Sequence, residues 1–194
     1  AKVVPATVAS TTTIAAARST YGARATVTVT VANGTAGNVT LSGAGAAQTR
    51  PVASGRAVFT LPPTLRPGTY HVTATYSGTT GVTASTGAGT LAIAKARTGV
   101  IKVKVAKANK LTRKTRAKAT ITVATAPGLA KASGRVTVTL KLGKKTKRVS
   151  GTLRNGVVTV KLPKLPKKGK WKVTVTYTGD ANYLPAPRAR SRSG

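Results

Sequence analysis

Residues 68–78 read Gly-Thr-Tyr-His-Val-Thr-Ala-Thr-Tyr-Ser-Gly, and residues 169–179 repeat the pattern as Gly-Lys-Trp-Lys-Val-Thr-Val-Thr-Tyr-Thr-Gly. Each copy follows a Leu-Pro pair, at 61–62 and at 162–163, so the two copies lie 101 residues apart. Within each copy a large apolar, aromatic or Ala side chain occupies every second position, which is the period of a β-strand with one buried face. The chain is therefore predicted to contain two copies of one β-structured unit.

The same period of two recurs in other segments of both halves, and each set of alternating residues is predicted to form one core face. These sets are Val27, Val29 and Val31; Val136, Val138, Leu140 and Leu142; Val158, Val160 and Leu162; and Trp171, Val173, Val175 and Tyr177. Turn signals such as Asn33-Gly34 and Asn155-Gly156 separate the runs, and no segment shows a convincing helical period. The fold class is therefore predicted to be all-β, as two tandem β-sandwiches that meet near residues 95–99.

The composition argues against an enzyme. The 194 residues include 33 Lys and Arg but one acidic residue, Asp180, one histidine, His71, and no Glu or Cys. Acid/base catalysis, metal binding and hydrolytic triads need clustered carboxylates, imidazoles or thiols, so we expect no catalytic residues, no metal and no cofactor. His71 is expected to be an exposed strand residue, and Asp180 to close an Asx-type turn.

The segment Tyr177-Thr178-Gly179-Asp180-Ala181-Asn182-Tyr183 carries a family resemblance. It resembles the Tyr-Ser/Thr-Gly-Asp-x-x-Tyr signature of bacterial Ig-like domains, which occur in tandem on secreted and surface proteins. The first copy departs from the signature at Thr79. The resemblance implies two immunoglobulin-like sandwiches that serve as spacers, adhesive modules or structural parts. It also implies a tyrosine corner at Tyr70, whose place Trp171 takes in the second copy.

Four segments are predicted along the chain. They are an N-terminal extension (1–10), Ig-like domain 1 (11–95), a highly basic Ig-like domain 2 (96–187) and a basic tail (188–194).

Positive charge is concentrated in the second half, with seven Lys and Arg in residues 1–95 and 26 in residues 96–194. Lysines that alternate with core residues are expected on outward strand faces, at positions 102, 104, 118, 141, 161, 170 and 172. A charged surface normally mixes both signs, so this imbalance predicts a polyanionic partner, either teichoic acid, acidic polysaccharide, nucleic acid bound nonspecifically or an anionic envelope. The predicted polyanion-binding residues lie in basic clusters: Arg113, Lys114, Arg116, Lys144, Lys145, Lys147, Arg148, Lys164, Lys167, Lys168 and Lys170.

The sequence also predicts that domain 2 lacks its last strand, G. Residues 89–94 end the first copy as an alternating strand, whereas residues 188–194 read Arg-Ala-Arg-Ser-Arg-Ser-Gly and offer no large apolar side chain. The missing strand would leave an acceptor groove beside Trp171, Val173, Val175 and Tyr177, and the N-terminal extension, through Val4, Ala6 and Val8, is the predicted donor strand. Head-to-tail exchange would then form a fibre. The alternatives are a shortened chain, a tail that pairs despite its arginines, and an N-terminal linker from a larger protein.

Two functions follow from these observations. One is a non-enzymatic, secreted structural subunit of an extracellular filament or surface assembly, with self and anionic polymers as partners. The other is a monomeric module that attaches a larger enzyme, adhesin or phage particle to an anionic cell surface. Secretion is expected because the chain has no Cys, which fits secreted bacterial proteins, and because it begins at Ala1, as after removal of a signal peptide. No apolar run is long enough for a transmembrane segment.

Overall fold

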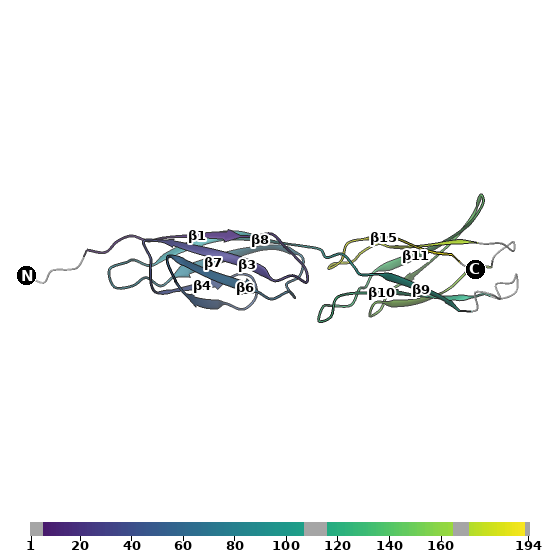
Figure 1. Cartoon of the computed structure of the whole chain (residues 1–194), viewed down its shortest axis with the longest axis horizontal. Coiled ribbons are helices and arrows are strands. Elements are labelled where there is room, and N and C mark those ends of the chain that lie inside the picture. Colours follow the sequence, from purple (N-terminus) through teal and green to yellow (C-terminus); the bar gives the residue numbers. More distant parts are fainter. Residues whose placement is uncertain (1–5, 107–115, 165–170, 193–194) are drawn as a thin grey trace, which may run out of the picture. The chain divides into compact units, whose positions relative to one another are not determined.

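A computed structural model of the chain describes residues 6–106, 116–164 and 171–192, with residues 187–192 described by their backbone alone. The chain divides into two compact units, unit 1 (Ala1–Ala94) and unit 2 (Lys95–Gly194). Each unit is built from two β-sheets, and the described residues form strands and turns but no helix (Figure 1). The fold is therefore all-β, as the alternating sequence predicts.

Unit 1 contains a three-stranded and a five-stranded sheet. The first has the order β1-β3-β6, with β1 (Thr11–Ala16), β3 (Ala25–Ala32) and β6 (Arg56–Leu61). The second has the order β2-β8-β7-β4-β5, with β2 (Ser19–Thr20), β8 (Ser85–Ala94), β7 (Gly68–Tyr76), β4 (Asn38–Ser42) and β5 (Gln48–Pro51). All pairings are antiparallel except that of β2 with β8, which is parallel.

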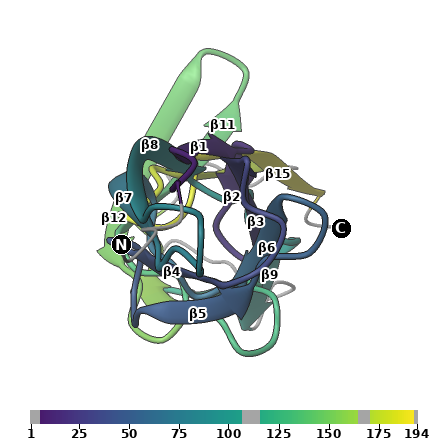
Figure 2. The same cartoon turned by 90° about the vertical axis from the view of Figure 1, so that its left-hand side faces the viewer.

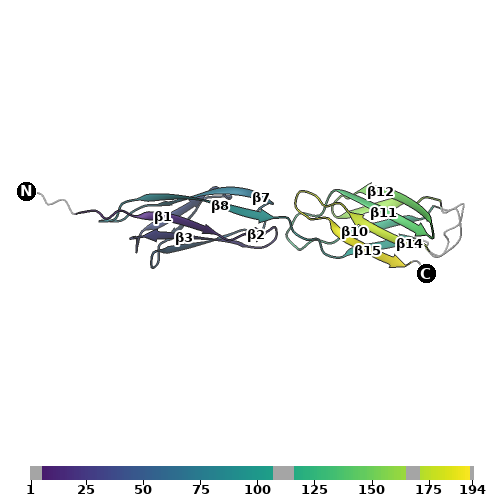
Figure 3. The same cartoon turned by 90° about the horizontal axis from the view of Figure 1, so that it is seen from above.

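Unit 2 has the same two-sheet design. Its three-stranded sheet has the order β13-β10-β9, with β13 (Val157–Lys161), β10 (Lys118–Val123) and β9 (Ile101–Ala106). Its four-stranded sheet has the order β12-β11-β14-β15, with β12 (Lys145–Thr152), β11 (Arg135–Leu142), β14 (Lys172–Tyr177) and β15 (Ala186–Arg192), seen side by side in Figure 3. Strands β11 and β12 form a hairpin of this sheet, and the turn end of the hairpin projects from the rest of the unit (Figure 2).

Alternation of side chains along the strands separates the core from the surface. In β11, Val136, Val138 and Leu140 are buried, and the residues between them face outward. In β14, Val173, Val175 and Tyr177 are likewise buried. Burial of apolar side chains between two sheets is the main term that stabilises such a sandwich.

The predicted turns are present where the chain needs them. Asn155 and Gly156 both have positive φ, 51° and 79°, as a tight two-residue turn requires. Asn33 also has a positive φ of 62°. The tyrosine corner is confirmed, because the Tyr70 hydroxyl donates a hydrogen bond of 2.9 Å to the carbonyl oxygen of Arg66.

The prediction that domain 2 lacks its last strand was wrong. Strand β15 pairs antiparallel with β14 from Lys172↔Arg192 to Tyr177↔Ala186, with a register shift between Val175 and Tyr177. Backbone pairing does not require large apolar side chains, so a segment rich in Arg, Ala and Ser can still complete a sheet. The acceptor groove is therefore absent: Trp171, Val173, Val175 and Tyr177 are buried and β15 lies beside β14.

One residue of the predicted donor strand, Val8, pairs with residues of unit 1. Val8 donates a backbone hydrogen bond of 2.8 Å to Gly81, and its carbonyl oxygen accepts one of 3.0 Å from Thr83. Ala6 and Val8 are exposed, and Val4 lies outside the described residues. The backbone groups of Val8 are thus already paired within this chain.

Candidate functional site

The outward face of the four-stranded sheet in unit 2, here named the β11 face, carries threonines and cations. Because β11 and β14 pair in register, their outward residues stand opposite one another in rows. The rows are Thr137 with Thr176, Thr139 with Thr174, and Lys141 with Lys172. Two lysines therefore lie directly opposite each other on neighbouring strands, a placement that normally destabilises a sheet.

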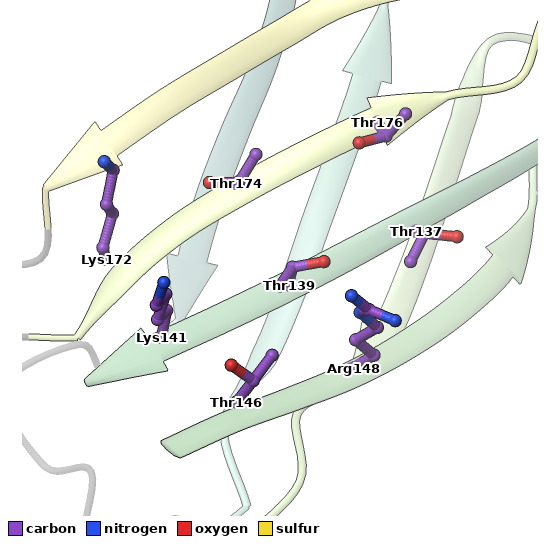
Figure 4. Close-up of a pocket in the computed structure, with 8 residues that line it drawn as sticks. All are labelled: Thr137, Thr139, Lys141, Thr146, Arg148, Lys172, Thr174 and Thr176. Carbon is purple, nitrogen blue, oxygen red and sulfur yellow. The ribbon is translucent and has the colours of Figure 1, made fainter. Parts of the chain in front are cut away.

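Together with residues of strand β12, this face forms a shallow concavity of about 500 Å³ (Figure 4). Arg148 of β12 pairs with Thr139, and Thr146 pairs with Lys141. Figure 4 shows Lys141 and Lys172 at one end, Thr139 and Thr174 in the middle, and Arg148 at the β12 side. The lining residues are Thr137, Thr139, Lys141, Thr146, Arg148, Lys172, Thr174 and Thr176. Such a surface offers hydroxyl groups and positive charge to a ligand, and no carboxylate.

Strand β15 continues the same rows by register. Arg190 pairs with Thr174, and Arg192 pairs with Lys172. The row that contains Thr139 and Thr174 thus lies between Arg148 on one strand and the Arg190 position on the other.

The outward face of the three-stranded sheet, here named the β10 face, is also basic. Lys102 and Lys104 of β9 pair with Thr122 and Thr120 of β10. Lys118 of β10 pairs with Lys161 of β13, which is a second directly opposed pair of lysines. All four lysines are exposed. Unit 2 therefore presents cations and threonines on both outer faces of its sandwich.

The single acidic side chain of the sequence does not neutralise these faces. Asp180 Oδ1 accepts backbone hydrogen bonds of 2.8 Å from Asn182 and from Tyr183, which confirms the Asx-type turn. Its Oδ2 accepts bonds from the Ser133 backbone N–H (2.7 Å) and hydroxyl (3.0 Å). Gly134 makes this approach possible, because its φ is +86° and a Cβ there would lie 2.5 Å from the Gly179 carbonyl oxygen.

These contacts set the ionisation of Asp180. Burial alone would raise the pKa of its carboxyl, but hydrogen bonds from Ser133, Asn182 and Tyr183 outweigh burial and hold this pKa below its ordinary value. Burial also raises the pKa of the neighbouring Tyr177 phenol well above its ordinary value, and the Asp180 charge adds to the shift. Asp180 is therefore a structural carboxylate that joins two loops.

The sequence of residues 8–94 matches the family model of the bacterial Ig-like domain (group 3). Unit 1 is a bacterial Ig-like domain. Unit 2 follows it in tandem with the same two-sheet fold and the 101-residue repeat described above.

Solved structures with a similar fold include the following two examples. One is a tetra-tandem repeat in the extending region of a large adhesion protein, at 18% identity and a TM-score of 0.56, covering 95% of this chain and 49% of that one. Another is a two-domain fibronectin type III segment of chicken tenascin, at 12% identity and a TM-score of 0.50, covering 92% and 95%. The chain thus spans about half the length of the adhesion-protein structure. No curated protein matches the sequence of this chain.

The Ig-like unit 1 provides an internal comparison for the β11 face. Its strands β4, β7 and β8 occupy the places of β11, β14 and β15, and their outward positions hold no lysine or arginine. His71 stands where unit 2 has Lys172 and is exposed, as predicted. By register, Ala88 and Thr90 stand where unit 2 has Arg190 and Arg192. The same Ig-like scaffold is therefore neutral on this face in unit 1 and cationic in unit 2.

The residues of the predicted polyanion site fall into three groups. Arg148 lines the concavity. Five others are exposed elsewhere on unit 2, at Arg116, Lys144, Lys145, Lys147 and Lys164. The remaining five, Arg113, Lys114, Lys167, Lys168 and Lys170, lie outside the described residues.

Sequence reasoning left Lys141 and Lys172 out of the site, although it placed both on outward faces. Runs of consecutive basic residues drew attention to loops, whereas the concavity is built from lysines and threonines that are far apart in sequence and adjacent in register. The available signal was the alternation of cations with core residues in two strands that pair.

Proposed function

We propose that this chain is a non-enzymatic, extracellular or surface-exposed Ig-like module in which unit 2 holds anionic polymers. The tandem Ig-like fold and its likeness to repeats of a large adhesion protein support a structural or adhesive role. The described residues contain no group of three or more His, Cys, Asp or Glu that could hold a metal ion, and no helix suited to crossing a membrane. The partner class is a teichoic acid, an acidic polysaccharide or a nucleic acid bound without sequence preference.

The observation that carries the proposal is the opposed pair Lys141 and Lys172 on the β11 face. Neighbouring strands are about 4.8 Å apart, so two ammonium groups rising from directly opposite positions repel each other. Asp180, the single acidic side chain of the sequence, is occupied by Ser133, Asn182 and Tyr183. An anionic group seated between the lysines would remove the repulsion and release counterions from the polymer.

The chemistry of the face favours nonspecific recognition. The residues lining the concavity are Thr, Lys and Arg, with no aromatic side chain on which a base could stack. The aromatic residues Trp171 and Tyr177 are buried in the core of the unit. Hydroxyl and cationic groups can bind the phosphate or sulfate groups of many polymers, and contacts to phosphate carry no sequence information.

The proposal does not include a filament formed by strand exchange, because β15 already pairs with β14. A surface module that binds polymers through its side chains is compatible with a complete sandwich.

The test is a titration of the fluorescently labelled full chain with long-chain polyphosphate, heparin and neutral dextran at several salt concentrations. The unit 2 variant carries Lys141→Thr, Arg148→Thr and Lys172→Thr, and the matched unit 1 variant carries Arg24→Thr, Arg50→Thr and Arg56→Thr. Both variants lose three positive charges at exposed positions.

We expect polyphosphate and heparin to bind in a salt-dependent way and dextran not to bind. The binding constant K should fall as the salt concentration rises. In the unit 2 variant, the magnitude of the slope of log K against log salt concentration should be smaller by about one for each lost contact, while the unit 1 variant should leave the slope nearly unchanged. Equal losses in both variants, or binding that salt does not weaken, would contradict the proposal.

A further inference from the structure

We infer that unit 2 is a two-sided binder that holds one polyanion chain on the β11 face and a second on the β10 face, and so cross-links anionic polymers. This inference rests on the proposed function and adds bivalency within a single Ig-like unit. A protein with one binding face coats a polymer, whereas a protein with two independent faces joins polymers into a network.

The two faces belong to different sheets whose inner sides form the core of unit 2. Val138 of β11, Val175 of β14 and Ile121 of β10 are each 0% exposed and fill the space between the sheets. The residues that alternate with them point away from this core, Lys141 and Lys172 on one sheet and Lys118 on the other. The two sets of cations therefore face in opposite directions.

The distance between the faces makes them electrostatically separate. Packed sheets lie about 10 Å apart, and the outward side chains of each sheet add to this separation. The Debye length at physiological ionic strength is about 8 Å, so salt screens most of the interaction between the two charged layers. A polymer that neutralises one face thus leaves the attraction of the other face largely intact.

Both faces also share the chemistry that would hold a polymer. The β11 face places Lys141, Lys172 and Arg148 around Thr139 and Thr174. The β10 face places Lys102, Lys104, Lys118 and Lys161 around Thr120, Thr122 and Thr159. Each face contains one directly opposed lysine pair, Lys141↔Lys172 or Lys118↔Lys161. Because the two faces share these features, the reasons for regarding one as a binding surface apply equally to the other.

The faces can be separated by three variants of the full chain, each losing three positive charges. The first removes the β11 face through Lys141→Thr, Arg148→Thr and Lys172→Thr. The second removes the β10 face through Lys102→Thr, Lys104→Thr and Lys118→Thr. The charge control replaces three exposed residues that belong to neither the β11 face nor the β10 face, through Lys131→Thr, Arg154→Thr and Lys164→Thr. Threonine suits the six strand positions, because it favours strands and already stands opposite Lys102, Lys104, Lys141 and Arg148 on the neighbouring strands.

The experiment measures bridging directly. Biotinylated long-chain polyphosphate is fixed to a surface, the protein is bound and washed, and capture of fluorescent polyphosphate from solution is then recorded at about 0.15 M salt. The amount of bound protein is measured in parallel, so that capture is expressed per bound protein.

We expect the unaltered chain and the charge control to bind and to capture the second polymer. Each single-face variant should still bind, through its intact face, but should lose capture by about tenfold or more. Single-face variants that capture as well as the unaltered chain would overturn the inference, because bridging would then come from self-association or from charge in general.

Two other results would also overturn it and would separate it from the proposed function. Binding of the unaltered chain without capture of a second polymer would refute bivalency and leave the proposed function standing. Failure of the unaltered chain to bind the fixed polyphosphate at all would refute both.

Discussion

Asp180 is the residue on which the loops of unit 2 depend most directly. Its two oxygens accept four hydrogen bonds from Ser133, Asn182 and Tyr183. Unit 1 has Thr79 in the corresponding place, so this carboxylate distinguishes the two copies of the repeat. The sequence predicted the turn at Asp180, but not the bonds to Ser133, which is 47 residues away along the chain.

We predict that Asp180→Ala lowers the free energy of unfolding of unit 2 by about 1–3 kcal/mol, since bonds to a charged acceptor are lost and donors are left unpaired. Trp171, the single tryptophan of the chain, reports on this unit in denaturant unfolding followed by fluorescence. Ser133→Ala should give a smaller loss, because it removes the hydroxyl bond alone. An unchanged Trp171 transition in Asp180→Ala would show that the turn does not depend on the carboxylate.

The same residue predicts an unusual pH dependence. The pKa of Asp180 is lowered in the folded unit, so its stabilising contribution is present above the unfolded value of 3.8 and is lost as the pH falls through the folded value. Residues 1–94 contain no Asp or Glu, so acid should weaken unit 2 and leave unit 1 nearly unaffected.

This difference can be measured by following Trp171 fluorescence for unit 2 and hydrogen exchange for unit 1 from about pH 6 to about pH 2. Asp180→Asn should flatten the dependence of unit 2. Parallel acid destabilisation of both units would contradict the assignment.

Repulsion between the opposed lysines Lys141 and Lys172 is expected to reduce the stability of unit 2. Lys141→Glu replaces a like-charge pair by an opposite-charge pair with Lys172, and should raise the stability of unit 2 by about 0.2–1 kcal/mol at low salt. The gain should shrink at about 1 M salt, where the charges are screened. Lys164→Glu, an exposed position outside the strands, is the control and should change the Trp171 transition less.

At the scale of elements, strands with large alternating side chains could be predicted from the sequence and β15 could not. Val136, Val138 and Leu140 of β11 identify their strand and its buried face without further information. In β15, by contrast, the residues that pair with Val173 and Val175 are Ser191 and Ala189. The apolar alternation that marks other strands is therefore missing.

Unit 1 explains why a last strand can have small residues at these places. In β8 the partners of Val72 and Ala74 are Gly89 and Gly87. A Cβ at Gly87 would lie 2.3 Å from the carbonyl oxygen of Thr12, so β1 leaves no room for a side chain there. The equivalent residues of unit 2 are small as well, and periodicity could not reveal the strand because its signal is side-chain size.

We predict that removal of residues 186–194 destabilises unit 2 and promotes self-association, because the edge of β14 loses its partner. Thermal unfolding followed at Trp171 and sedimentation velocity measure the two effects. Arg188→Ser, Arg190→Ser and Arg192→Ser together form the control, which removes the charge but keeps the backbone. Equal stability and a monomeric state after the truncation would show that β15 contributes nothing to the unit.

The candidate site has the cationic chemistry that the composition indicates, but the composition does not give its place in the fold. Composition alone predicted a polyanionic partner, because the sequence contains 33 Lys and Arg and a single Asp. Of the six described residues chosen from basic clusters, Arg148 alone lines the concavity, since clusters follow the order of the chain and the site follows the pairing of β12, β11 and β14. Register depends on the tertiary fold, and it decided which cations became neighbours.

At the scale of the whole molecule, two units with one fold differ in charge. Residues 1–94 contain six Lys and Arg, and residues 95–194 contain 27. The cations of strands β9, β10, β11 and β14 alternate with core residues and so remain on the outer faces, which is how the Ig-like scaffold tolerates them. The polyanion-binding role that we propose therefore falls to unit 2.

The most direct test is a lysine-reactivity footprint of the full chain, recorded by mass spectrometry with and without long-chain polyphosphate. The account predicts that polyphosphate protects the face lysines Lys102, Lys104, Lys118, Lys141 and Lys172, while the exposed Lys95 and Lys131 keep their reactivity. The protection should disappear at about 1 M salt. Uniform protection of every lysine, or stronger protection at Lys95 and Lys131 than on the two faces, would contradict the claim that the sheet faces of unit 2 hold the polymer.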